Sequence, residues 1–338
     1  MKMTMLNKVT AVMDEVDFSG TVLVKRNNDV LQQQSSGYAN RADWILNNVE
    51  TRFGIASGCK IFTAVAICQL VEKGQLSFES KLSEILDIPF TRFDEEITIH
   101  HLLTHTAGIP DYFDEEVMED FADLWVNQPM YLMRNGRDFL PLFQHEPMKL
   151  AVGERFHYNN AGYILLGLVV EQVSGKHFDE YMTEKIFNRA GMEHSGYFEL
   201  DALPSNTALG YIEKEDGSWK TNIYSVPVKG GADGGAFVTV EDMHRFWQAL
   251  MKFELLGEAM TQQLLTPYIH TDEDFDRFYG YGVWIDKKED CISKYHVMGY
   301  DPGVSFHSAF YPESGLVSVV CSNKSEGAFN VFKEIENA

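Results

Sequence analysis

The chain has 338 residues, of which 45% are hydrophobic and 23% charged, as expected for a globular protein with a substantial core. Its 28 basic and 50 acidic side chains give a net charge of −22. This charge would repel phosphate backbones and anionic lipid headgroups, which argues against binding to nucleic acids or membrane surfaces. No stretch approaches the ~18 apolar residues of a membrane-spanning helix. Because the N-terminus also lacks the apolar region of a secretory signal, we expect a cytoplasmic protein, unless a leader has been removed.

The first predicted elements are a β-hairpin and a long helix. Residues 20–31 have the pattern of two strands around a polar turn. A helix should begin near Ser57, because apolar residues recur after it at helical spacing, and Lys73-Gly74 supplies a basic last turn and a glycine stop. The apolar residues are Phe62, Val65, Ala66 and Leu70.

The middle of the chain, residues 76–228, is predicted to be mainly helical, with breaks at prolines and glycines. The apolar run 161–173 ends at Ser174-Gly175 and is typical of a buried helix with a glycine cap. A glycine-rich crossing over residues 230–235 precedes another predicted helix, 240–250.

Strands return near the C-terminus and are followed by a last helix; the predicted ranges are 281–286, 304–311 and 316–322 for the strands and 328–336 for the helix. Strands at both chain ends around a helical middle predict an α+β fold. We expect a single domain, 1–338, with an α/β part of about 1–75 and 230–338 and a helical part of about 76–229. A cleft between the two parts is where a site is expected.

The segment Ser57-Gly58-Cys59-Lys60 carries a candidate nucleophile. At a helix N-terminus the helix dipole favours negative charge, and the backbone N–H of a serine is free to bind an oxyanion. A lysine three residues later lies on the same helical face, so its amine can reach the hydroxyl and take its proton. Ser57 and Lys60 therefore fit nucleophilic catalysis, although this pair alone also fits a helix cap with an exposed lysine.

A second motif is Tyr158-Asn159-Asn160, directly before the predicted buried helix. With it the sequence resembles the serine β-lactamase and penicillin-binding-protein superfamily, in particular its class C β-lactamase-like branch of carboxypeptidases and esterases. That family has Ser-x-x-Lys at the start of a helix and Tyr-x-Asn in a loop before a buried helix, and the chain matches both. The likeness continues, in the family's order, over residues 18–24, 37–40, 97–110 and 234–242.

The resemblance implies a fold and a set of roles. The fold would be β-lactamase/transpeptidase-like, with an antiparallel sheet built from both chain ends, flanked by helices, and a mainly helical subdomain. Ser57 would attack a carbonyl group, and Lys60 and Tyr158 would share the work of the general base. Asn160 would orient either the substrate amide or the Lys60 amine.

The family's third motif, Lys-Thr-Gly or His-x-Gly before a Pro-Gly, fits less well. Counting back from Pro302-Gly303 places Val297-Met298-Gly299 on it, with valine in the basic position. Alternatively, a one-residue bulge places His296 there. The N–H of Tyr300, or of Gly299 in the bulged register, would complete the oxyanion hole with that of Ser57. We favour the first register, which leaves no cation for a substrate carboxylate.

These residues predict a serine hydrolase that forms an acyl-enzyme on an ester or amide bond. The substrate would be a small ester, peptide or β-lactam, and the motifs do not distinguish an esterase from a D-amino-acid peptidase, a carboxypeptidase or a β-lactamase. The alternative is a non-catalytic penicillin-binding or sensor protein that keeps the pocket. The oligomeric state cannot be read from these residues.

Two other groups of residues invite chemistry that we do not predict. His100, His101 and His105 have spacings that resemble a zinc site, but in the resembling family this stretch is a structural helix and a turn. Cys59 lies two residues after Ser57, and such residues point apart on a helix. We therefore expect no metal and no cofactor. The acidic stretch 111–123 is read as solvated surface or, alternatively, as a lid over a site.

Overall fold

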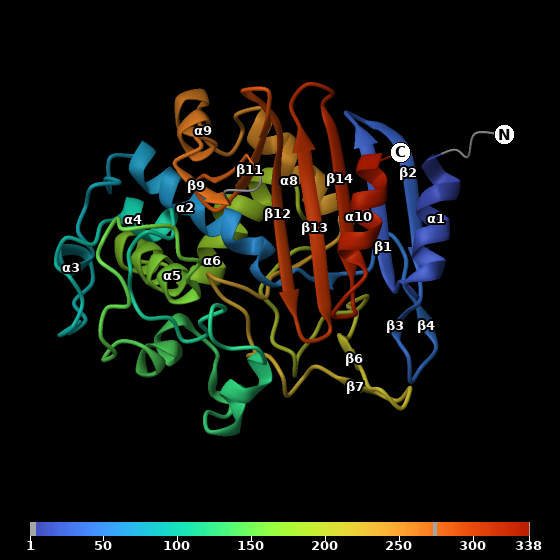
Figure 1. The fold of residues 1–338 in the computed structure, drawn as a ribbon, viewed down its shortest axis with the longest axis horizontal. Helices are drawn as coiled ribbons and strands as arrows, with labels where there is room; N and C mark the ends of the chain where they lie inside the picture. The colour runs from blue at the N-terminus through green and yellow to red at the C-terminus, as the bar shows by residue number, and fades with distance from the viewer. Residues whose placement is uncertain (1–4, 273–275, 338) are drawn as a thin grey trace.

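The fold is built on an eight-stranded antiparallel sheet, seen in a computed structural model that describes residues 5–272 and 276–337 (Figure 1). The strand order is β2-β1-β14-β13-β12-β11-β10-β9. The strands are β1 (Gly20–Arg26), β2 (Asp29–Ser36), β9 (Ile269–Asp272), β10 (Arg277–Tyr279), β11 (Trp284–Lys288), β12 (Cys291–Asp301), β13 (Val304–Tyr311) and β14 (Leu316–Ser322). Because β1 pairs with β14, the two ends of the chain form one sheet, as predicted.

Two terminal helices, α1 (Met5–Glu15) and α10 (Ala328–Asn337), cover one face of this sheet (Figure 1). Their apolar sides pack on β1, β13 and β14 and form a small core of their own, which includes Val9, Val22, Val320, Val331 and Phe332. Most residues of β13 and β14 are therefore buried on both faces of the sheet.

The other face packs against the main core, which contains α2 (Lys60–Glu72), α5 (Asn160–Ser174) and α8 (Val240–Met251). Residues 60–70 of α2 are all buried, because this helix crosses the middle of the molecule with packed neighbours on every side. Gly175 ends α5 with a φ of 69°, a left-handed conformation that favours glycine. The predicted helices 161–173 and 240–250 are thus confirmed.

The middle of the chain is less regular than the expected mainly helical segment. Apart from α5, its α-helices are short, and the helical residues within 104–159 are all in 3₁₀ turns. The helices here are α3 (Leu82–Ile85), α4 (Ile99–Leu103), α6 (Phe178–Met182) and α7 (Asn188–Ala190), with a π-helical turn at Thr183–Phe187 and 3₁₀ turns at Phe121–Val126, Met130–Leu132 and Gly136–Leu142.

Short ribbons and one further helix complete the fold. They are β3 (Tyr38–Asn40), β4 (Ile45–Leu46), β5 (Phe53–Gly54), β6 (Tyr211–Glu213), β7 (Trp219–Thr221), β8 (Phe237–Val238) and α9 (Glu258–Leu264). The pair β5–β8 holds the segment before Ser57 against the segment after the glycine-rich crossing. Within the described ranges, no helix combines the length and the apolar character needed to cross a bilayer.

Candidate active site

Ser57 lies in a 3₁₀ turn, Ala56–Cys59, that leads directly into α2. In a 3₁₀ helix residues i and i+3 eclipse each other, so the turn places the Lys60 side chain directly over Ser57. The Lys60 amine donates to Ser57 Oγ at 2.9 Å. Ala56 has a φ of 44°, unusual for a residue with a Cβ, so backbone strain is located immediately before the candidate nucleophile.

Lys60 is only 1% exposed, and its amine contacts three oxygen atoms. It donates to Asn160 Oδ1 at 2.8 Å and to the Asp233 carbonyl at 2.6 Å, in addition to Ser57 Oγ. The amide and carbonyl oxygens can only accept, whereas the serine hydroxyl can donate or accept. A neutral amine could therefore keep its two donated bonds and accept the serine proton without moving.

Asn160 is held at the start of α5 by a residue that the sequence reading missed. The Asp111 carboxylate accepts the backbone N–H groups of Asn160 at 2.6 Å and Ala161 at 2.9 Å. A carboxylate at this end of a helix also complements the helix dipole. Burial raises the pKa of Asp111 to about 7, although these hydrogen bonds and the charge of Lys60 act in the opposite direction.

Tyr158 lies beside the lysine amine in a wall of aromatic rings. Lys60 Nζ is 4.9 Å from the centroid of its ring, and Trp284 stacks on it at 6.2 Å. Burial raises the pKa of Tyr158 well above its usual value, the charge of Glu115 adds to this, and the Ser57 hydroxyl lowers it. The phenol is therefore neutral in the resting site.

Gly299 allows β12 to approach the serine turn. A Cβ at this position would lie 2.1 Å from the Ile55 carbonyl oxygen and 2.8 Å from Ser57 N, so only glycine fits. Tyr300 follows it at the edge of the cavity, and its hydroxyl group bonds His307. The first N–H groups of a helical turn have no partner within that turn, so the N–H of Ser57 is suited to an oxyanion.

Val297 and His296 lie on opposite faces of β12. The pairing of residues 295–301 with β13 continues without a register shift, so side chains alternate and Val297 shares the face of Gly299. His296 is 3% exposed and bonds Asp286 at 3.2 Å; it does not line the cavity. The bulge that would turn His296 toward the serine is absent from this pairing, so the geometry gives no support to its role as a substrate ligand.

A cavity of about 690 Å³ opens at Ser57. Its wall includes Tyr158, Asn160, Gly299 and Tyr300. The buried Lys60 reaches this site through its amine, which contacts Ser57, whereas His296 does not line the cavity. Apolar residues form much of the wall, among them Phe113, Phe121, Phe139, Phe198, Leu200, Phe237 and Met298. The acidic stretch predicted to be surface or lid contributes Glu115, Glu119 and Asp120.

Two further acidic residues in this cavity were also missed by the sequence reading. Asp233 comes from the glycine-rich crossing, is 6% exposed and accepts a hydrogen bond from the Tyr112 hydroxyl. Asp301 ends β12. One sequence signal could have identified Asp233: it is the single charged residue in Gly230–Gly235, where the other five residues are glycine or alanine.

The three histidines of the apparent zinc pattern do not converge. Each bonds a different neighbour: His100 the Tyr281 hydroxyl, His101 the Thr98 side chain and His105 the backbone N–H of Asn159. Their side chains instead fix local structure around α4 and the Tyr158 loop.

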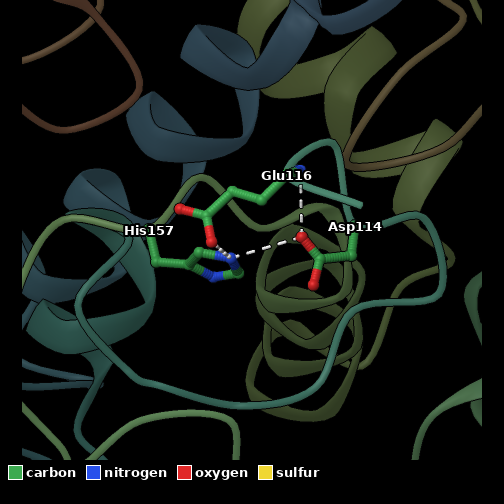
Figure 2. Close-up of side chains that lie close together, drawn as sticks. All are labelled: Asp114, Glu116 and His157. Atoms are coloured by element: carbon green, nitrogen blue, oxygen red, sulfur yellow. Dashed lines mark hydrogen bonds and ion pairs between the residues drawn. The ribbon is translucent and has the colours of Figure 1, made fainter. Parts of the chain in front are cut away.

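A different cluster, Asp114, Glu116 and His157, places its ligand-type atoms within 4.8 Å of one another (Figure 2). The Lys149 ammonium contacts all three, with Nζ 3.2 Å from Glu116 and 2.9 Å from His157 Nε2. Arg155 also donates to Glu116, at 2.9 and 3.1 Å. Because these two cations already neutralise the two carboxylates, the cluster acts as an ion-pair network. It ties the acidic loop to the residue before Tyr158.

Comparisons with known proteins agree with this architecture. The chain is 61% identical to a crystallised penicillin binding protein from Bacillus halodurans, with a TM-score of 0.94 over 97% of this chain and 99% of that one. It is 28% identical to an octameric penicillin-binding protein homologue from Pyrococcus abyssi, with a TM-score of 0.82 over 95% of this chain and 73% of that one. It is 27% identical to the putative penicillin-binding protein PbpX of Bacillus subtilis (strain 168), covering 95% of this chain and 74% of that protein. The family model described as Beta-lactamase matches residues 7–338, and the chain therefore belongs to the beta-lactamase family.

Proposed function

We propose that the protein is a serine hydrolase in which Ser57 forms an acyl-enzyme on an ester, amide or β-lactam bond. The observation that carries this proposal is the 2.9 Å contact between Ser57 Oγ and the amine of the buried Lys60, at the floor of the cavity. A structural lysine at a helix N-terminus would extend into solvent, whereas this one has only neutral oxygen partners and faces a hydroxyl group.

The proton path begins at the Ser57 hydroxyl. The Lys60 amine accepts the proton as the hydroxyl oxygen attacks the carbonyl carbon, and its bonds to Asn160 and Asp233 hold it in place. Tyr158 acts as a neutral phenol that can pass a proton to the leaving group and take one back. Its raised pKa favours this relay over a permanent phenolate.

Two backbone N–H groups would bind the developing oxyanion. The N–H of Ser57 lies at the start of the turn, and the N–H of Tyr300 belongs to the strand that Gly299 brings against it. One such donor typically contributes about 3–4 kcal/mol to the transition state. Water then attacks the acyl group, and Lys60 and Tyr158 return the proton to Ser57.

A penicillin-binding or sensor protein without turnover is not favoured. The serine, the amine and the phenol lie together at one site, and the amine already contacts the hydroxyl. Relatives named penicillin-binding proteins support the use of a penicillin as an acylating probe.

The test is covalent labelling followed by intact-mass spectrometry. A penicillin or a fluorophosphonate should add one adduct to the wild type and none to Ser57→Ala, because the alanine has no nucleophile. Ser77→Ala, at an exposed serine, is the matched control and should label like the wild type. An undiminished adduct on Ser57→Ala would place the nucleophile elsewhere.

A further inference from the structure

Most of the charged residues that line the cavity are acidic. Five carboxylates line it, from Glu115, Glu119, Asp120, Asp233 and Asp301. Among the lining residues that the structure describes, the basic one is Lys229, and its ammonium already pairs with Asp179 at 2.7 Å. A cleft lined by a single sign of charge attracts the opposite charge and repels its own.

Of the cavity carboxylates, Asp301 is partly buried and has no polar side-chain partner among the described residues. Within residues 5–272 and 276–337, neither a hydrogen bond nor an ion pair to its side chain is observed, whereas Asp233 at least accepts the Tyr112 hydroxyl. Burial raises the pKa of Asp301 to about 7, the charge of Asp233 adds to this, and Lys60 lowers it. A bound cation would supply the missing partner.

The position of Asp301 along β12 indicates which part of a substrate it would meet. Side chains alternate along a strand, so Asp301 projects from the same face of β12 as Gly299, the face that contacts the Ser57 turn. It lies about 7 Å farther along the strand than Gly299, at about 3.4 Å per residue. It also directly follows Tyr300, the expected oxyanion donor, and lines the same cavity as Ser57, within reach of groups attached close to the scissile carbonyl.

We propose that the natural substrate carries a protonated amine close to the scissile carbonyl, as in an aminoacyl ester or amide with a free α-ammonium group, and that Asp301 binds that amine. The apolar wall leaves room for a side chain on the same carbon atom. This substrate class rests on the proposed serine hydrolase function. It is also the reverse of carboxylate recognition, for which Val297 and the turned-away His296 provide no cation.

The test compares three substrates that differ in one group. The p-nitrobenzyl esters of alanine (both enantiomers), isobutyric acid and methylmalonic acid carry an ammonium, a methyl and a carboxylate group on the same carbon atom. Release of p-nitrobenzyl alcohol is measured at pH 7. A charge-assisted hydrogen bond should raise kcat/KM of one alanine ester over the isobutyrate ester by about tenfold to a hundredfold, mainly through KM. The methylmalonate ester should be the slowest.

Asp301→Asn should bring the ratio of kcat/KM between the alanine and isobutyrate esters below about threefold, because the amide no longer attracts the ammonium. Glu313→Gln, in the exposed turn between β13 and β14, removes the same charge and should keep the wild-type ratio. If circular dichroism shows that Asp301→Asn is unfolded, Asp301→Ser is measured in its place. The order of kcat/KM for the three esters with the wild type also tests the proposal without any variant.

The two proposals fail in different ways. A wild type that hydrolyses the isobutyrate or methylmalonate ester as well as the alanine esters, or a selectivity that survives in Asp301→Asn, would overturn the ammonium site alone. Failure to cleave any of the esters, or cleavage that persists in Ser57→Ala, would overturn the serine hydrolase.

Discussion

Three side chains share one small volume at the floor of the cavity, and each depends on the others for its role. Lys60 contacts the Ser57 hydroxyl at 2.9 Å and lies under the ring of Tyr158. Asn160 fixes the amine from the other side. Since one proton moves among the serine, the lysine and the tyrosine, removing any one of them should disable the same step.

Lys60→Met and Tyr158→Phe should each lower kcat/KM for a neutral p-nitrophenyl ester by a factor of about 10² or more, because each interrupts the proton path. The double variant should lose little more than either single one. Tyr224→Phe, at a tyrosine that is 75% exposed, is the matched control and should keep wild-type activity. Losses that multiply in the double variant would show that the two residues act in separate steps.

At the scale of elements, the site depends on how closely β12 approaches the turn before α2. Gly299→Ala should lower kcat/KM by about 10² or more and lower Tm, because its Cβ would lie 2.1 Å from the Ile55 carbonyl oxygen and push the strand away from Ser57. Gly74→Ala is the control: its φ of 69° disfavours alanine, yet no atom lies within 4 Å. It should cost about 1 kcal/mol of stability and leave kcat/KM unchanged. Equal activity in both variants would mean that this approach does not matter.

The acidic loop is a second element that the fold positions, and its anchor is Lys149. Removing this ammonium leaves Asp114, Glu116 and His157 without their shared cation. Lys149→Met should therefore loosen the loop that carries the cavity residues Glu115 and Glu119, raising KM by about three- to tenfold with a smaller change in kcat.

Hydrogen exchange should report the same change as faster exchange over residues 111–123. Lys176→Met, which breaks only an exposed pair with Glu184, should leave both measurements unchanged. An unchanged KM and unchanged exchange in Lys149→Met would show that Lys149 is not needed to hold the loop, which also pairs through Glu116 with Arg155.

Over the whole molecule, buried acids make stability depend on pH. Asp301 binds its proton more tightly in the native state, with a pKa of about 7 against an ordinary value of 3.8, mainly because of burial. Its contribution to stability is therefore present below about pH 4 and is lost as the pH rises through 7. Burial shifts the pKa of Asp111 and Asp233 in the same direction.

Asp301→Asn should therefore gain Tm relative to the wild type as the pH rises, by roughly 2–5 °C at pH 8.5 and by little or nothing at pH 4.5. Calorimetry at a series of pH values measures this difference. Glu313→Gln, which makes the same change in net charge at an exposed site, should show a Tm difference that does not vary with pH. A difference for Asp301→Asn that is equally independent of pH would mean that its carboxylate is solvated.

The sequence by itself determined the fold class and the pairing of Ser57 with Lys60. Strand and helix periodicities are local, and the predicted ranges 304–311 and 316–322 coincide with β13 and β14. The contact between a serine and a lysine three residues apart is also local, because one helical turn fixes it. The irregular backbone of residues 104–159 was predicted less well, because it follows the wall of the cavity rather than a repeating pattern.

Only the tertiary structure decided what surrounds the reacting atoms. Asp233 reaches Lys60 across 173 positions of sequence, and Asp111 reaches Asn160 across 49. Whether His296 faces the serine depends on the register of β12 with its neighbours, since a shift of one residue would reverse every side chain. Charge and burial in the cavity arise from segments that meet only in the folded chain, and so the acidic character of the site could not be read from its motifs.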